Sequence, residues 1–137
     1  MGNSRVLTGQ LSDHKGMTLD IKEGWQVCIM MTTQSYFNQR VILKNQYGRI
    51  FFEQIRGRNK PMEPVFSQVI RNFAFAQPTL LIDVPESSRV DCRFSEVKID
   101  NDKGEYVAVS YTFMVEDSTD YDYNDLLLHI TAYRNVG

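Results

Sequence analysis

Hydrophobic and polar residues alternate along most of the chain from residue 17 onward, the pattern of half-buried β-strands. The clearest run covers residues 105–116, and its small or polar residues, Ala108, Ser110, Thr112 and Met114, share one face. The opposite, hydrophobic face consists of Val107, Val109, Tyr111, Phe113 and Val115. The last run, residues 126–133, has Leu126, Leu128, Ile130 and Ala132 in the inward phase.

The remaining strand-like stretches indicate one all-β domain. They are residues 17–21, 25–32, 37–43, 49–55, 67–76, 79–84 and 90–100, with hairpin turns at 45–48 and 101–104. About nine short strands at this spacing predict an antiparallel β-sandwich, and no strong helical periodicity competes with them. We interpret residues 1–16 as an N-terminal arm or edge strand and residues 17–137 as the sandwich domain.

Composition and charge narrow the classes of function. The chain has 137 residues, and its net charge of −2 argues against nucleic acid as a partner. Cys28 and Cys92 lie within strand-like runs, so we expect two buried free thiols instead of a disulfide. No stretch is apolar enough for a signal peptide or a membrane span, so we expect synthesis in the cytoplasm, with a non-classical route if the protein is exported.

The chemistry is concentrated in residues 116–125, which read EDSTDYDYND and hold five carboxylates and one carboxamide. No Lys or Arg occurs between Gly104 and Tyr133. Two carboxylates about 4 Å apart repel by roughly 4 kcal/mol at an effective dielectric near 20, so such a loop needs a cation or another partner. Oxygen ligands at this density suit Ca²⁺, which takes about 6–8 of them.

The candidate ligands are Glu116, Asp120, Asp122, Asn124 and Asp125. Five carboxylates exceed the demand of one ion, which favours two ions with shared ligands. An EF-hand is excluded because Asp125 and Thr131 stand where that loop needs Gly and Glu, and because the flanks are strands. The alternative is a solvated acidic turn, since Asp, Asn and Ser form turns by themselves.

Catalysis is disfavoured. Paired carboxylates can hydrolyse glycosides, but such pairs come from different strands of a larger cleft. Zinc hydrolysis needs His or Cys ligands, and His14 and His129 both lie far from the acidic stretch in sequence. His129 falls on the outward phase of the last strand, which predicts a surface or interface residue. We therefore expect no enzyme.

The stretch EDSTDYDYND, followed by a hydrophobic strand and a C-terminal glycine, resembles the bacterial calcium-dependent fucose/mannose-binding lectins (LecB-like, two-calcium lectins). Their motif reads E-D-G-T-D-x-D-Y-N-D, and only Ser118 departs from its fixed positions. The resemblance implies a nine-stranded sandwich with two Ca²⁺ ions per subunit. It also implies a homodimer or higher homo-oligomer in which the C-terminus reaches the partner's site.

The resemblance also implies the site residues. Glu116, Asp120, Asp122 and Asp125 would hold one ion; Asp122, Asn124, Asp125, the Thr32 carbonyl and the carboxylate of Gly137 of the partner subunit would hold the second. The sugar would contact Thr33, Gln34, Ser35, Asp117, Asp120, Asp122, Asn124, Asp125 and Gly137. Residues 33–35 would form the specificity loop. The leading hypothesis is a lectin for monosaccharides such as fucose or mannose, and the alternative is a calcium-stabilised structural or adhesion module that binds no sugar.

Overall fold

The computed structural model describes residues 4–12, 16–33, 37–57, 66–71, 73–74, 76–84, 91–116 and 125–134. This part of the chain forms ten β-strands. They are β1 (Ser4–Ser12), β2 (Gly16–Thr18), β3 (Gln26–Thr33), β4 (Asn38–Lys44), β5 (Ile50–Gly57), β6 (Phe66–Ile70), β7 (Thr79–Asp83), β8 (Asp91–Asp100), β9 (Tyr106–Glu116) and β10 (Leu126–Tyr133). No helix in these ranges is long and apolar enough to cross a membrane.

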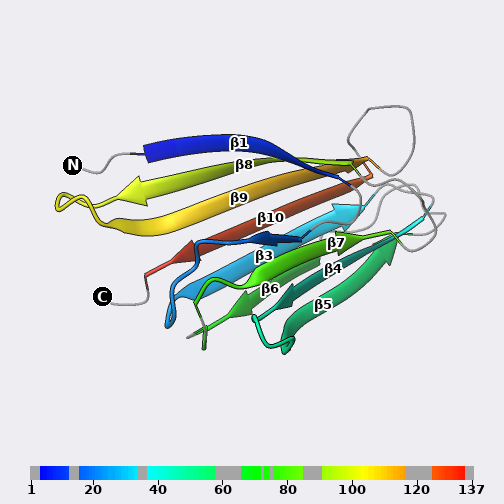
Figure 1. Cartoon of the computed structure of the whole chain (residues 1–137), viewed down its shortest axis with the longest axis horizontal. Helices are drawn as coiled ribbons and strands as arrows, with labels where there is room; N and C mark the ends of the chain where they lie inside the picture. The colour runs from blue at the N-terminus through cyan, green and yellow to red at the C-terminus, as the bar shows by residue number, and fades with distance from the viewer. Residues whose placement is uncertain are drawn as a thin grey trace.

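The strands form two antiparallel sheets that lie one over the other (Figure 1). The larger sheet has the order β1-β8-β9-β10-β3-β6, and the smaller has the order β2-β7-β4-β5. The smaller sheet covers only part of the larger one, so β8 and β9 extend beyond it in Figure 1. The predicted all-β antiparallel sandwich is confirmed, with ten strands where about nine were expected.

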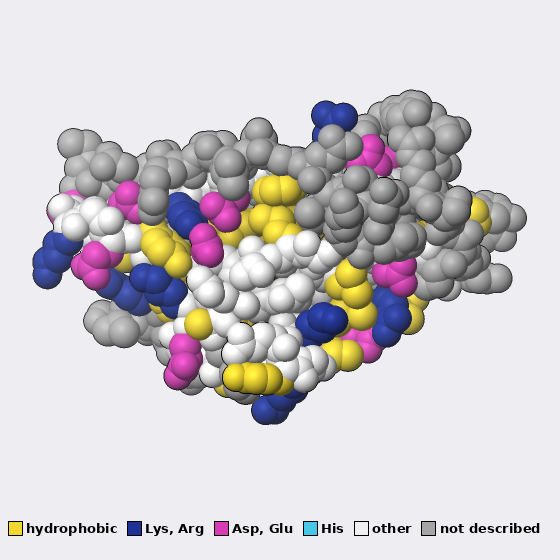
Figure 2. Space-filling model, in the orientation of Figure 1, with side chains coloured by type: hydrophobic (Ala, Val, Ile, Leu, Met, Phe, Trp, Pro, Cys, Tyr) yellow, Lys and Arg dark blue, Asp and Glu magenta, His cyan; other side chains and the backbone are white. Residues whose placement is uncertain are grey.

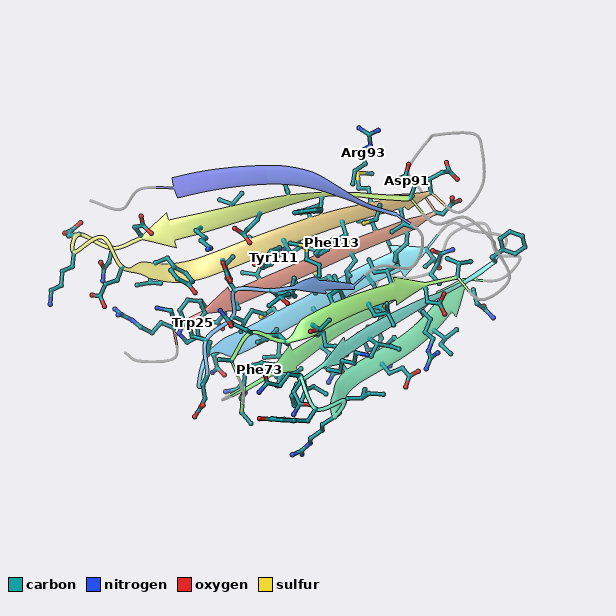
Figure 3. All side chains as sticks on the ribbon, in the orientation of Figure 1. Trp25, Phe73, Asp91, Arg93, Tyr111 and Phe113 are labelled. Carbon is teal, nitrogen blue, oxygen red and sulfur yellow. The ribbon has the colours of Figure 1, made fainter. Side chains whose placement is uncertain are left out.

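The core lies between the sheets and consists of the side chains that the alternation placed inward. Val27, Ile29 and Met31 of β3 are buried, and so are all four inward residues of β10. Figure 3 shows Tyr111 and Phe113 of β9 extending from the larger sheet into this space. Both rings are fully buried and stack at a centroid distance of 5.9 Å.

Two predicted strands are shorter than expected. In each case the residues after the strand leave the sheet, and a hydrophobic side chain among them packs into the core. A strand was predicted over residues 17–21, but β2 ends at Thr18. The next residue, Leu19, donates its N–H to the Pro78 carbonyl (2.9 Å). The stretch 67–76 leaves β6 after Ile70, and Phe73 exchanges backbone hydrogen bonds with Trp25 and Gly24. Leu19 and Phe73 are both buried, so burial of their side chains stabilises the fold more than further strand hydrogen bonds would.

A polar network closes the sandwich at the end where β3 begins. The Tyr111 hydroxyl accepts the Asp20 N–H (2.7 Å) and donates to Glu96 Oε2 (2.5 Å), while Lys98 donates to Asp20. Burial and the Glu96 hydrogen bond raise the pKa of Tyr111, which outweighs the lowering effect of the Asp20 N–H. Figure 2 shows Lys or Arg and Asp or Glu side chains gathered over β8 and β9, where the smaller sheet does not reach.

We predict that Tyr111→Phe lowers the free energy of unfolding by about 1–3 kcal/mol, because it leaves a backbone N–H and a carboxylate without their partner. Urea denaturation measures this loss. The matched control is Tyr106→Phe, which removes a single hydroxyl 3.2 Å from the Asp20 carbonyl on a half-buried ring and should cost less. Equal stability of Tyr111→Phe and the wild type would show that the network contributes nothing.

Candidate functional site

Three acidic residues occupy adjacent positions at the ends of neighbouring strands of the larger sheet. Asp91 is the first residue of β8 and pairs directly with Glu116, the last residue of β9. Asp125 immediately precedes β10, and its N–H donates to the Val115 carbonyl at 3.0 Å. Because Leu126 pairs with Val115, this register brings Asp125 beside Glu116. We call Asp91, Glu116 and Asp125 the acid row.

The acid row is buried, which makes its charge costly. Asp91, Glu116 and Asp125 are exposed by only 6%, 0% and 8%. Directly opposed like charges destabilise a strand pair, and a buried carboxylate requires a cation or several hydrogen-bond donors. Arg93 lies two residues from Asp91 on the same face and is exposed, as Figure 3 illustrates where β8 begins.

The end of β3 supplies further oxygen atoms next to the acid row. Thr33 pairs with Leu126, and it is the last residue of β3, not a loop residue as the sequence suggested. The strand extends to this position because the β-branched side chain fits the inward phase, where it is 1% exposed. Its Oγ1 has no hydrogen-bond partner among the described residues. Thr32 lies inside the strand opposite Leu127, with its side chain on the outer face.

The structure therefore brings together four of the predicted site residues, namely Glu116, Asp125, Thr32 and Thr33. The other predicted residues lie outside the described ranges, and they are Gln34, Ser35, Asp117, Asp120, Asp122, Asn124 and Gly137. Among the described residues, no three His, Cys, Asp or Glu side chains are grouped closely enough to hold an ion. The carboxylates of Glu116 and Asp125, beside that of Asp91, are hard oxygen donors of the kind that Ca²⁺ prefers.

Asp91 is the residue that the sequence analysis missed. It lies outside the acidic stretch, 25 positions before its cross-strand partner Glu116, so no local motif includes it. The only signal was its position at the start of a predicted strand. Burial, reinforced by the Asp91 carboxylate, raises the pKa of the neighbouring Cys92 thiol to about 12. Cys92 is thus protonated at neutral pH, and both cysteines are free, although Cys28 is only half-buried.

A small hollow lies on the outer face of the larger sheet beside Thr32 and Leu127. Met30, Met31, Thr32, Leu127 and His129 line it, and its volume of about 40 Å³ is too small for a monosaccharide. A sugar at this edge would therefore need residues beyond those described. The hollow is apolar, which also makes it unsuitable as the hydroxyl-binding part of a site.

His129 belongs to a hydroxyl network and not to the acid row. Its ring nitrogens lie 2.7 Å from Thr131 Oγ1 and 3.2 Å from Thr112 Oγ1, and Ser110 Oγ lies 3.4 Å away. A serine hydrolase needs a carboxylate to orient the histidine. In the described part of the chain the His129 ring meets hydroxyl groups only, so this cluster does not form a catalytic triad.

Comparison with known proteins establishes the fold. No protein-family model matches the chain, and no curated protein matches its sequence. The structure is similar to the C-terminal domain of the BC2L-C lectin from Burkholderia cenocepacia, with a TM-score of 0.62 and 13% identity over 90% of this chain and 99% of that one. It is also similar to the Ralstonia solanacearum high-affinity mannose-binding lectin, with a TM-score of 0.55 and 14% identity over 89% of this chain and 96% of that one.

A third similar structure is the Chromobacterium violaceum lectin CV2L in complex with α-methyl-fucoside. Its TM-score is 0.55, with 15% identity over 89% of this chain and 96% of that one. The resemblance to fucose/mannose-binding lectins, first visible in the acidic stretch, is thus confirmed at the level of the fold. At this low identity the likeness shows the fold alone, and the ligand of this chain must be argued from its own residues.

We predict that Thr33→Val does not destabilise the metal-free protein, because the buried hydroxyl that it removes makes no hydrogen bond within the described fold. Urea denaturation in the presence of a chelator measures this. The matched control is Thr112→Val, which removes a hydroxyl in contact with His129 and should cost about 1 kcal/mol. A loss of that size in Thr33→Val itself would mean that Oγ1 has a structural partner.

Proposed function

We propose that this chain is a lectin, which binds carbohydrate without transforming it, and that it does so through two Ca²⁺ ions held by residues 116–125. The observation that carries the proposal is the buried acid row. Asp91 and Glu116 face each other directly at the sheet edge, and Asp125 joins them from the next strand. A divalent cation bound beside carboxylates at adjacent strand positions offsets the repulsion among them.

The proposed division of roles follows the resemblance to the two-calcium lectins. Glu116 ends β9 and Asp125 immediately precedes β10, so both ends of the acidic stretch are tied to the sheet. Asp120, Asp122 and Asn124 supply the remaining side-chain ligands, and the Thr32 carbonyl approaches from β3. Bound calcium offers coordination positions that neighbouring sugar hydroxyls fill in place of water. Asp117 and residues 33–35 then hydrogen-bond the sugar and select it.

Fucose and mannose are the sugars that we propose for this site. One similar lectin is described as mannose-binding, and another is in complex with a fucoside. These two descriptions support the choice of sugar, and both sugars can be titrated directly. The acidic loop and residues 33–35 decide which of the two sugars binds more tightly.

A second copy of the chain belongs to the proposal, with the carboxylate of Gly137 of the partner subunit completing one calcium site. The outer face of the larger sheet is compatible with such a copy. The outward-facing residues of β9 (within 108–114), β10 (within 127–133) and β3 (within 26–32) include no Asp, Glu, Lys or Arg. Met30, Met114 and Leu127 are exposed on this face, so a second copy meets apolar surface without like-charge repulsion.

We predict that Ca²⁺ raises the melting temperature and that a chelator lowers it, because an ion that binds only the folded chain stabilises it. At one hundred times its Kd a single ion contributes about 2.7 kcal/mol. Differential scanning calorimetry measures the shift, and Asp122→Asn should abolish it. The control Asp102→Asn makes the same charge change in the distant 101–104 turn and should keep the full shift. An unchanged melting temperature in the wild type would refute the calcium proposal.

We predict that methyl α-mannoside or methyl α-fucoside binds the calcium-loaded chain and that binding disappears with chelator or in Asp122→Asn. Isothermal titration calorimetry measures both effects. Deletion of Gly137 should weaken binding if the partner's carboxylate completes the site, and retained affinity would remove that residue from the proposal. If calcium stabilises the chain but neither sugar binds, the alternative of a structural module holds.

A further inference from the structure

A second hollow lies at the opposite end of β3 from the acid row. Its volume is about 310 Å³, which falls at the lower limit of small-molecule sites. Three segments far apart in sequence surround it, namely the turn before β3, the turn between β4 and β5, and the backbone before β7. Glu23, Asn45, Gln46, Tyr47, Ala76 and Gln77 line it.

Tyr47 is presented at this hollow on a backbone that is fixed independently of its ring. The Asn45 side chain is buried, and its Oδ1 accepts the N–H groups of Tyr47 and Arg49, each at 2.9 Å. Gly48 takes the positive φ of 87° that the turn requires and donates to the Asn45 carbonyl (3.1 Å). The turn is therefore complete without the Tyr47 ring, which is 84% exposed. An aromatic ring so displayed contributes little to the fold.

Gln77 forms a strained wall of the same hollow. It has a φ of 51°, the only positive value at a non-glycine residue in the described part of the chain. The position also precedes Pro78, where extended backbone is favoured. The Gln77 N–H donates to the Ile21 carbonyl (2.8 Å), and this bond holds the strained backbone in place. Glycine would adopt this conformation at lower cost, and strained backbone of this kind is often found at binding sites.

Glu23 supplies an acceptor from the third segment. The neighbouring Gly24 donates to the Phe73 carbonyl (2.7 Å), and Trp25 N–H reaches the Lys22 carbonyl (3.3 Å), which ties this turn to the core. None of the described residues that line the hollow is basic, which disfavours phosphate and other anions. These residues offer one ring, three primary amides and one carboxylate, and the Asn45 amide oxygen is engaged by its own turn.

We propose that this hollow is a second carbohydrate site, independent of calcium, that takes a neutral pyranose. The apolar C–H face of the sugar ring stacks on Tyr47, and Gln46 and Gln77 can each donate to and accept from hydroxyl groups. The Glu23 carboxylate accepts further hydroxyl protons. Exposed aromatic and amide groups suit a sugar, which is neither charged nor strongly apolar.

The position of this site makes a single chain bivalent. Tyr47 and Gln77 lie beside the start of β3, and Thr33 ends the same strand beside the acid row. Eight residues of extended strand separate the two regions, roughly 26 Å at 3.3 Å per residue. One copy would thus hold two sugar units at opposite ends of the sandwich.

The test is a heteronuclear NMR titration of the calcium-loaded chain with methyl glycosides of glucose, galactose and mannose. We expect at least one to shift the signals of Gln46, Tyr47 and Gln77, and the shifts at Thr33 and Asp125 report the acid row separately. Tyr47→Ala should weaken the binding at the hollow about tenfold, which is about 1.4 kcal/mol, and leave the signals of the acid row unchanged. Tyr47→Phe is the matched control that keeps the stacking surface.

A second variant separates binding from folding. Gln77→Gly removes one amide and relieves the strained backbone, so it should weaken the glycoside while the urea midpoint stays equal or rises. If none of the three glycosides moves the signals of Gln46, Tyr47 and Gln77, the second site does not exist. Binding that Tyr47→Ala leaves intact would equally overturn it. Neither result bears on the calcium site, whose signals are followed independently.

Discussion

The burial of like charges at one sheet edge is the constraint on which the functional account depends. Asp91 and Glu116 are cross-strand neighbours, and Asp125 is held beside them by its N–H bond to the Val115 carbonyl. A sheet order of β8-β9-β10-β3 is what places these acids and Thr33 on adjacent strands. The topology that builds the hydrophobic core therefore also concentrates negative charge. A bound cation would offset that charge and leave the core unchanged.

Buried polar groups occur towards both ends of the sandwich. At the start of β3, Asp20, Glu96, Lys98 and Tyr111 are mutually hydrogen-bonded or ion-paired, so the charges there compensate one another. Burial works against the charge on Lys98, but Asp20 and Glu96 outweigh it and raise the pKa of the ammonium group. At the other end, the three carboxylates of the acid row occupy adjacent strand positions, which is where we propose the cations.

Much of the fold could be predicted because alternation with period two is a local property of the sequence. The long runs of β9 and β10 were predicted to within one residue, and their inward residues are the core. The short strands were overestimated where Leu19 and Phe73 leave the ladder to fill the core, since that exchange depends on distant partners. Asp91 was missed for the same reason, because only strand pairing brings it to Glu116.

The sequence motif resembles that of the two-calcium lectins, the fold is similar to that of three lectins, and the ligand itself is left to experiment. The most direct measurement is a crystal structure of the chain grown with Ca²⁺ and methyl α-mannoside. The account predicts two ions beside Asp125, with carboxylate oxygens at about 2.3–2.6 Å and sugar hydroxyls in both coordination spheres. An acid row without an ion at saturating calcium, with Glu116 and Asp125 contacted by basic side chains or water alone, would contradict it.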